Sequence, residues 1–197
     1  MVDKDIPSVP SAPSPHLDPS PSLPPATQLC IKRLRDLFAD RPITTRRAIY
    51  NTYLSIHGPG TASEKENWRP VLRFALPHVS YMFKSGPYRD AYVLYGIDPR
   101  KENKWAGYQT AIFNFRDKDG KAKGKEEDGQ GAGDATSHLF TGREVGTKTV
   151  CYCFKDITDP MLRKILDDAV LRERFHVCPL VSVYVPFGLT GEFSGVC

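Results

Sequence analysis

The sequence lacks the patterns on which catalysis and metal binding usually depend. It contains no Gly-x-Ser-x-Gly element, phosphate-binding loop, HExxH pair or dinucleotide fingerprint. Its five cysteines are odd in number and form no Cys-x-x-Cys pair, so neither a disulfide framework nor a four-ligand zinc site is indicated. We therefore predict that the protein is not an enzyme and holds no metal or cofactor.

Long apolar segments are also missing. No run of about eighteen apolar residues, the length that a membrane-spanning helix needs, is present. The first thirty residues do not show the charged and then apolar order of a signal peptide. We expect an intracellular protein with no membrane partner.

The 17 prolines and 15 glycines fall mainly into two stretches that carry few large apolar residues. Residues 1–27 repeat proline with serine, and we predict a disordered tail because such a segment cannot offset the entropy of folding. Residues 117–136 are rich in Lys, Glu, Asp and Gly and are predicted to be a disordered charged insertion. The folded core is expected at 28–116 with an extension at 137–176, whereas 177–197 shows no clear period.

Apolar residues recur at helical spacing in the first part of the core. The pattern predicts a first helix that begins at Thr27, as its N-cap, and ends at Arg41 before a proline. A second helix is predicted from Pro42 to about residue 56, because proline is tolerated in a first turn.

A third stretch, 68–84, is helical by pattern but contains Pro77. Proline removes a backbone donor and clashes with the preceding turn of a helix. We therefore predict that this stretch divides into a helix over 68–76 and a second helix that begins at Pro77.

Two aromatic and β-branched runs, at 92–95 and 108–115, are typical of strands. Joined by a basic connection at 96–107, they predict a β-hairpin. Helices followed by a hairpin are the element order of a winged helix, in which one helix enters the major groove and the hairpin lies along the backbone. The predicted fold class is α+β, a winged helix (helix-turn-helix plus β-hairpin wing) with a small additional strand and helix.

The additional elements are predicted in the extension. Residues 149–154 are strand-like, and Cys151 and Cys153 alternate along them, as expected of two small apolar residues that face a core. Asp159 precedes a proline and is expected to cap a helix. Capping explains this residue better than a catalytic pair of carboxylates with Asp156 would.

Positive charge is concentrated in one part of the chain. The segment from Gln28 to Lys104 has fourteen Lys or Arg against seven Asp or Glu, a net charge of +7, whereas the chain from Trp105 onward has twelve against thirteen. A block of charge creates a directed field that scattered charges do not. It favours a nucleic-acid partner, although a solvated basic face without a partner is the alternative.

The basic residues of this block are interleaved with aromatic and turn residues, as on a nucleic-acid surface. Arginine can bond bidentately to phosphate or guanine, and lysine supplies point charge. The candidate DNA-contacting residues are Arg46, Arg47, Arg73, His78, Tyr81, Lys84, Tyr88, Arg89, Arg100, Lys101 and Lys104. Core packing is the alternative for the aromatic residues, and an ion pair with Asp90 or Asp98 is the alternative for Arg89.

Several longer segments resemble a known family, the DNA-binding domain of the box-A-associated tau A subunit of general transcription factor IIIC. The resemblance extends over about residues 34–174. The segments that carry it are RPI at 41–43, LRFALPHVSYMF at 72–83, SGPYRD at 85–90, YGIDPRK at 95–101, YQ at 108–109, HLFTG at 138–142 and DITDP at 156–160.

This resemblance implies a nuclear, non-enzymatic subunit that helps recognise the internal promoter of transfer-RNA and other RNA polymerase III genes and assemble the initiation complex. Its partners would be double-stranded DNA and other subunits of the factor. By the same resemblance, DNA contacts would come from the helix after Pro77 and from the segments 86–89 and 98–101. Family members carry a β-barrel before this domain that pairs with a smaller subunit. Here a Pro/Ser-rich tail precedes it, so pairing by that route is not expected.

Two other functions compete with duplex binding. The aromatic residues and the charged insertion could dock onto other subunits of a transcription complex, which makes the chain a protein-interaction module. Alternatively, Tyr92, Tyr95, Phe113 and Phe115 could form a stacking platform for single-stranded RNA.

Overall fold

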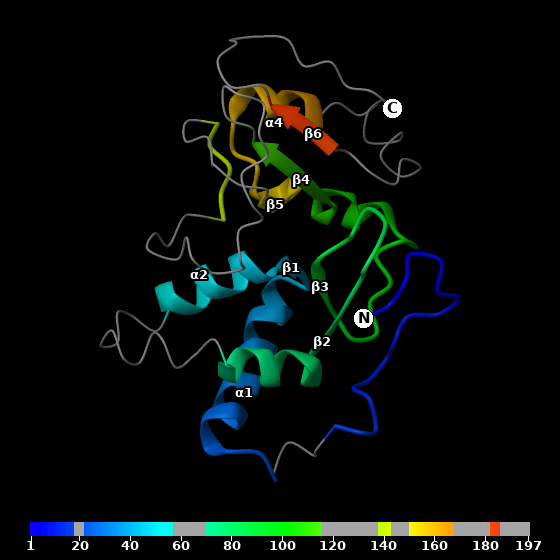
Figure 1. The fold of residues 1–197 in the computed structure, drawn as a ribbon, viewed down its shortest axis with the longest axis vertical. Coiled ribbons are helices and arrows are strands. Elements are labelled where there is room, and N and C mark those ends of the chain that lie inside the picture. Colours follow the sequence, from blue (N-terminus) through cyan, green and yellow to red (C-terminus); the bar gives the residue numbers. More distant parts are fainter. Residues whose placement is uncertain (18–21, 57–69, 116–137, 143–149, 168–181, 186–197) are drawn as a thin grey trace.

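The computed structural model describes residues 1–17, 22–56, 70–115, 138–142, 150–167 and 182–185. Within these ranges it contains two three-stranded sheets, with helices packed against them (Figure 1). The predicted α+β class is therefore confirmed. The predicted insertion at 117–136 and most of 177–197 lie outside the described residues.

The first helix, α1 (Pro25–Asp40), has the amphipathic pattern that the sequence predicts. Cys30, Ile31, Leu34 and Phe38 form its buried face, and Arg41 is its C-cap, as expected before a proline. The N-cap prediction is wrong, however. The helix begins at Pro25 after Pro24, which makes no side-chain cap bond, and Thr27 lies inside the first turn.

The second predicted helix begins later than expected, because its first turn is replaced by a strand. Residues Ile43–Thr45 form β1, and α2 (Arg46–Ile56) follows directly. The β-branched residues of β1 are all buried and pair with β3 (Ala91–Leu94). Thr45 Oγ1 accepts a hydrogen bond of 3.3 Å from the Ala48 amide and so helps to start α2.

The helix predicted to begin at Pro77 is wrong. Residues 70–75 are helical, Leu76–His78 form a 3-10 turn (η2), and Ser80–Met82 form strand β2. Side chains in this strand alternate between two clusters, with Met82 against one and Tyr81 against the other. Pairing with β3 at Tyr81↔Val93 therefore overrides the helical spacing of the sequence.

The predicted hairpin of 92–95 with 108–115 is also wrong, although both strands exist. The first sheet has the order β1–β3–β2, with both pairs antiparallel. Because β3 has a neighbour on each side, it leaves no edge for the later strand. The hairpin is instead formed by β2 and β3, and residues 83–90 connect them (the β2–β3 loop).

The later strand, β4 (Thr110–Phe115), belongs to the second sheet. It pairs antiparallel with β5 (Val150–Cys153) and parallel with β6 (Ser182–Val185). A 3-10 segment, η3 (Asn103–Tyr108), lies in the connection before it. The predicted strand and capped helix of the extension are confirmed as β5 and α4 (Pro160–Leu166), with Asp159 Oδ1 accepting a 2.9 Å hydrogen bond from the Leu162 amide.

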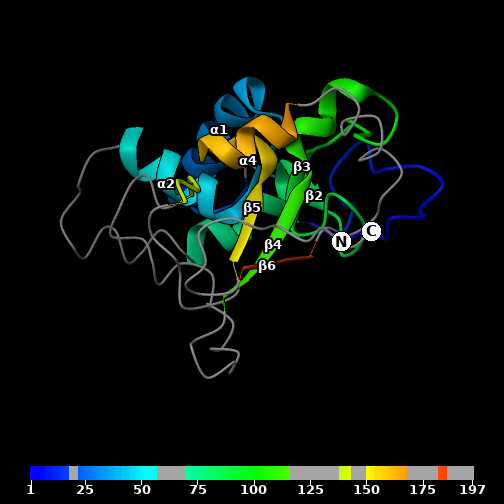
Figure 2. The same cartoon turned by 90° about the horizontal axis from the view of Figure 1, so that it is seen from above.

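The beginning of the chain is not the detached tail that its composition predicts. Residues 2–10, here called the strap, begin at the edge of β2 and continue beside the connection after β3 (Figures 1 and 2, darkest blue). Val2 forms a parallel bridge with Phe83, and Ile6 and Val9 pack against the same apolar cluster. These few apolar residues are separated by proline, serine and charged residues, so the sequence pattern does not reveal them.

Candidate nucleic-acid interface

Helix 70–75 presents one face to the core and another to solvent. Leu72 and Ala75 are buried in the cluster beneath α1, whereas Arg73 and Phe74 are exposed. Phe74 is 67% exposed, which is unusual for a phenylalanine beside a well-packed core. An exposed arginine next to an exposed aromatic ring is a combination suited to nucleic acid.

The β2–β3 loop has a fixed shape and exposes two cations. Thr110 holds it from one side, because its amide donates to Pro87 O at 2.8 Å and its hydroxyl donates to Arg89 O at 2.7 Å. Lys84 pairs with Asp3 of the strap at 3.0 Å, and Arg89 Nε lies 3.6 Å from the Asp90 carboxylate. All four side chains of these pairs are about half exposed, so the pairs are weak. The Arg89 Nε atom itself is buried and makes no hydrogen bond, so the rest of the guanidinium would have to meet a ligand.

Arg100 lies between Asp98 and the strap, and its donors are bonded to both of them. Its Nε and Nη2 each donate a 2.8 Å hydrogen bond to Asp98, whose side chain is nearly buried. Its Nη1 donates to the carbonyl oxygens of Lys4 and Ile6 in the strap. The guanidinium holds the pKa of Asp98 below its usual value through these hydrogen bonds. Because its donors have these partners, the structure argues against the predicted contact of Arg100 with DNA.

We expect Arg100→Ala to lower the free energy of unfolding by about 1–3 kcal/mol, because it leaves the carboxylate of Asp98 with fewer partners. The neighbouring exposed Lys101 provides the control, since Lys101→Ala should change stability by less than about 0.5 kcal/mol. Urea denaturation of both variants measures the difference. Equal stabilities for the two variants would show that the Arg100 network contributes nothing to folding.

Tyr81 and Tyr88 are core residues, so the prediction that they contact DNA is wrong. Tyr81 is 5% exposed and its hydroxyl donates to Ile97 O at 2.7 Å. Tyr88 is 2% exposed and donates to Pro99 O at 3.0 Å. Burial raises the pKa of Tyr88 to about 12 and that of Tyr81 further. His78 does not share a helical face with them, because it ends the η2 turn before β2.

Arg46 and Arg47 begin α2 and are half-buried. The Arg46 guanidinium donates to the Tyr92 hydroxyl through Nη2 at 2.7 Å, with its central carbon 5.8 Å from the centre of that ring. This contact joins the start of α2 to β3, so Arg46 has a structural role whether or not it also meets a ligand.

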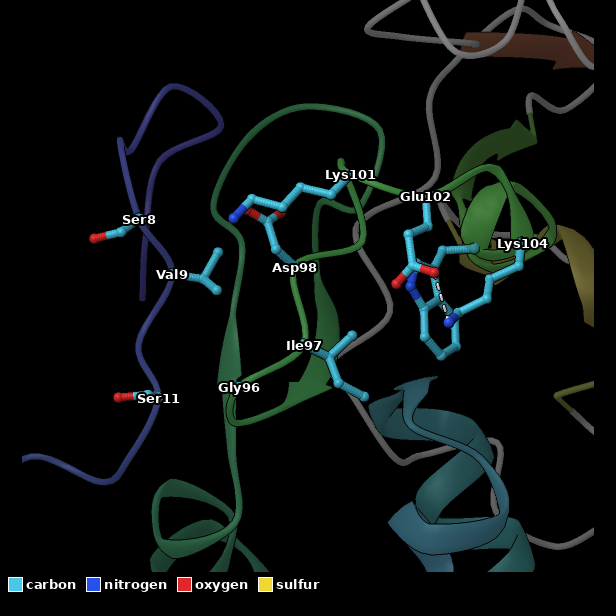
Figure 3. A pocket seen from close by; sticks show the side chains of 10 residues that line it. Ser8, Val9, Ser11, Gly96, Ile97, Asp98, Lys101, Glu102 and Lys104 are labelled. Atoms are coloured by element: carbon cyan, nitrogen blue, oxygen red, sulfur yellow. Dashed lines mark ion pairs between the residues drawn. The ribbon is translucent and has the colours of Figure 1, made fainter.

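Lys101 and Lys104 line an open groove of about 530 Å³ beside the strap (Figure 3). Ser8, Val9 and Ser11 form one wall of the groove, and residues 96–105 form the other. Lys104 pairs with Glu102 at 2.7 Å and lies 4.8 Å from the centre of the Trp105 ring. Lys104 donates a hydrogen bond that lowers the pKa of Glu102. Both lysines are exposed and remain candidates for ligand contact.

Sequence reasoning missed the ion pair that joins the two sheets. Arg41 follows α1, and Asp156 lies in the 3-10 turn after β5 (η4, Phe154–Asp156). The two form a bidentate pair with distances of 2.7 and 2.6 Å, and the Asp156 side chain is only 4% exposed. An arginine and an aspartate 115 positions apart carry no local signal of such a contact.

Two of the three described cysteines are inert core residues, whereas Cys151 is half-buried. Cys30 and Cys153 are buried, and burial raises the pKa of each thiol to about 11. No group of three His, Cys, Asp or Glu side chains gathers as a metal site would require within the described ranges. In the same ranges, no helix has both the length and the apolar character to cross a lipid bilayer.

Exposed cations lie on helix 70–75 and on the β2–β3 loop, and comparison with known proteins shows the family of the chain. A family model described as "Tau95: RNA polymerase III transcription factor (TF)IIIC subunit HTH domain" matches residues 1–114, which is more than half of the chain. The chain belongs to this family. The resemblance to the transcription factor IIIC subunit is thereby confirmed, and the match of the Tau95 domain includes the strap.

Individual Tau95 relatives are similar over stretches of 89 to 149 residues. "Transcription factor tau subunit sfc1" of Schizosaccharomyces pombe is 34% identical over 149 residues, which cover 76% of this chain and 28% of that protein. "Transcription factor tau 95 kDa subunit" of Saccharomyces cerevisiae is 38% identical over 89 residues, 45% of this chain and 12% of that protein. "General transcription factor 3C polypeptide 5" of Mus musculus is 30% identical over 92 residues, 47% of this chain and 15% of that protein.

A solved structure named "Sfc1-DBD" has a similar fold. It superposes with a TM-score of 0.64 at 30% identity, covering 85% of this chain and 70% of that chain. The curated Tau95 relatives are much longer than the part that matches, since the chain spans about a quarter of sfc1 and less of the others.

Proposed function

We propose that the chain is the DNA-binding part of a transcription factor IIIC subunit and that it binds duplex DNA at RNA polymerase III promoters. The observation that carries this proposal is the similarity to Sfc1-DBD over 85% of the chain. We further propose that the DNA is the box A region of transfer-RNA and similar genes. The chain would act in the nucleus beside other subunits of the factor.

We infer that the first sheet and its helices form a winged helix, on other residues than those predicted from the sequence. Along the chain the described elements are α1, β1, α2, helix 70–75, β2, the β2–β3 loop and β3. The three strands form a sheet in the order β1–β3–β2. In a winged helix the helix before the hairpin enters the major groove, and the hairpin loop is the wing. Helix 70–75 would therefore be part of the recognition helix and the β2–β3 loop would be the wing.

The contacts follow from this assignment. Arg73 would reach the groove from the helix, while Lys84 and Arg89 would meet phosphates from the wing. The exposed ion pairs of Lys84 and Arg89 contribute little free energy, so exchanging a carboxylate for a phosphate is not costly. Lys101, Lys104 and Arg47 would add charge at the periphery, and Arg100 would only support the strap.

A titration with salt tests this proposal. If the chain neutralises about four phosphates, the logarithm of duplex affinity should fall with the logarithm of salt concentration at a slope of roughly −4. Fluorescence anisotropy with a promoter-length duplex gives the slope, and single-stranded DNA and RNA of the same sequence serve as controls. A slope near zero for duplex, or tighter binding of the single strands, would contradict duplex binding.

Burial of two of its four residues argues against the stacking platform for single-stranded RNA. Tyr92 and Phe113 are buried, and Phe113 stacks on Phe140 with ring centres 4.7 Å apart. The Tyr95 hydroxyl donates to Pro77 O at 2.8 Å.

One observation favours the alternative that the chain is a protein-interaction module. Met161 and Ile165 are exposed one turn apart on α4. We propose that this face contacts another subunit in addition to DNA binding elsewhere.

A further inference from the structure

We propose that the edge of β2 and the Arg100 guanidinium form a docking site for an extended peptide in which an acidic residue follows an apolar one. In this structure the strap occupies the site. We infer that the strap is an exchangeable ligand and that a partner segment of the same chemistry can replace it.

The site binds its ligand largely through hydrogen bonds to main-chain atoms. The Val2 amide donates to Met82 O at 2.8 Å, and the Lys84 amide donates to Val2 O at 2.9 Å, which is how a parallel strand adds to a sheet edge. Arg100 Nη1 donates to the carbonyl oxygens of Lys4 and Ile6 at 2.8 and 2.7 Å. Because Asp98 fixes the other side of the guanidinium, Nη1 is aimed at the ligand before it binds.

Two side chains of the ligand give selectivity. Val2 is buried in the cluster that contains Tyr81, Phe83 and Tyr88, so this position requires an apolar residue. The Asp3 carboxylate accepts a 2.5 Å hydrogen bond from the Ser85 hydroxyl and pairs with Lys84. The hydrogen bonds from Ser85 and Lys84 lower the pKa of Asp3 to about 2, which shows that the site favours a charged carboxylate at this position.

The strap is held mainly by hydrogen bonds to its main chain and buries few of its side chains, as an exchangeable ligand should. Val2 is its one fully buried residue among positions 1–10, whereas Ile6 and Val9 are half-buried. Positions 11–16 are exposed, and the groove of about 530 Å³ separates Ser8 and Ser11 from the opposite wall (Figure 3). The strap therefore competes with other segments as a tethered ligand on an exposed connection.

Two glycines provide a matched pair for a steric test. Gly86 and Gly96 have nearly the same left-handed φ, 83° and 84°, so alanine is strained equally at both. A Cβ at Gly86 would lie 2.8 Å from Lys4 Cβ in the strap, whereas a Cβ at Gly96 would meet nothing within 4 Å. Gly86→Ala should therefore block the site. The Gly96 amide donates a 3.1 Å hydrogen bond to Pro10 O of the strap, and Gly96→Ala keeps this donor, so it should leave the site open.

The experiment uses the full chain with Val2→Glu, which undocks its own strap and leaves the site unchanged. A fluorescent peptide of residues 1–12 should bind this variant at least about tenfold more tightly than it binds the unchanged chain, where the tethered strap competes at millimolar effective concentration. The peptide with Val2→Glu should not bind. Adding Gly86→Ala to the Val2→Glu chain should abolish binding, and adding Gly96→Ala should not.

Failure of the peptide to bind a folded Val2→Glu chain would overturn the proposal, as would equal binding to the Gly86→Ala and Gly96→Ala versions. A second measurement does not depend on the Val2 variant. In the otherwise unchanged chain, hydrogen exchange at the Lys84 amide, which is bonded to Val2 O, should accelerate at least about tenfold with Gly86→Ala but not with Gly96→Ala. Equal exchange in the two variants would make the strap a fixed part of the fold.

Discussion

Replacing Asp156 by alanine is expected to lower the free energy of unfolding by about 3–5 kcal/mol, because it leaves the Arg41 guanidinium partly buried without its counter-charge. Arg41 also donates to Ile43 O at 3.3 Å, so the ion pair ties the start of β1 to the second sheet. Urea denaturation followed by circular dichroism measures the change. We expect one cooperative transition at a lower urea concentration.

The control for this prediction is a second aspartate in an equally short ion pair on the surface. Arg163 and Asp167 pair at 2.7 Å on α4, but both side chains are about two-fifths exposed. Asp167→Ala should therefore cost less than about 1 kcal/mol. Replacing both buried partners, with Arg41→Met and Asp156→Leu, should recover most of the loss, because no charge remains unpaired. Similar costs for Asp156→Ala and Asp167→Ala would contradict the argument.

Elements with a strong local signal could be predicted from the sequence. The buried face of α1 has helical spacing over four turns, and Pro42 ends the helix whatever its surroundings. Asp159 before a proline identifies the start of α4 in the same way, since the cap and the first turn are both local. These features depend on neighbours along the chain and not on distant contacts.

Elements that depend on pairing could not be predicted in this way. The residues of β2 fit both a helix and a strand by spacing, and only the position of β3 decides between them. The partner of β3 is likewise a question of topology, because the connection of 8 residues to β2 (83–90) and the connection of 15 residues to β4 (95–109) can both join antiparallel strands. Helical spacing therefore predicts the helix before Pro77, but it places the DNA-contacting helix after that proline.

Within the candidate site, the sequence likewise does not show which individual side chains are available to a ligand. Arg100 and Lys101 are neighbours with the same charge, yet one is fixed between Asp98 and the strap and the other is exposed. Composition predicts a basic surface but cannot say which cations already have internal partners. That information depends on the buried position of Asp98 and on the path of the strap, and neither has a sequence pattern.

Reversing the charge of Arg73 is expected to weaken duplex binding by about 1–3 kcal/mol, roughly 5- to 150-fold, if helix 70–75 enters the groove. The residue is exposed, so Arg73→Glu should leave the free energy of unfolding within about 0.5 kcal/mol of its original value. Anisotropy titrations with a promoter duplex and with an unrelated duplex measure the loss. A larger loss on the promoter would indicate base reading, and equal losses would indicate a phosphate contact.

Arg35→Glu is the matched control, because Arg35 is exposed on α1 and its reversal changes the net charge by the same amount. A contact made by helix 70–75 predicts a clearly larger effect for Arg73, whereas a general electrostatic field predicts similar effects for both. His78→Ala adds a further distinction. A helix beginning at Pro77 would require this side chain in the groove, but in η2 it is half-buried at the end of a turn, and its loss should change affinity less than the loss of Arg73.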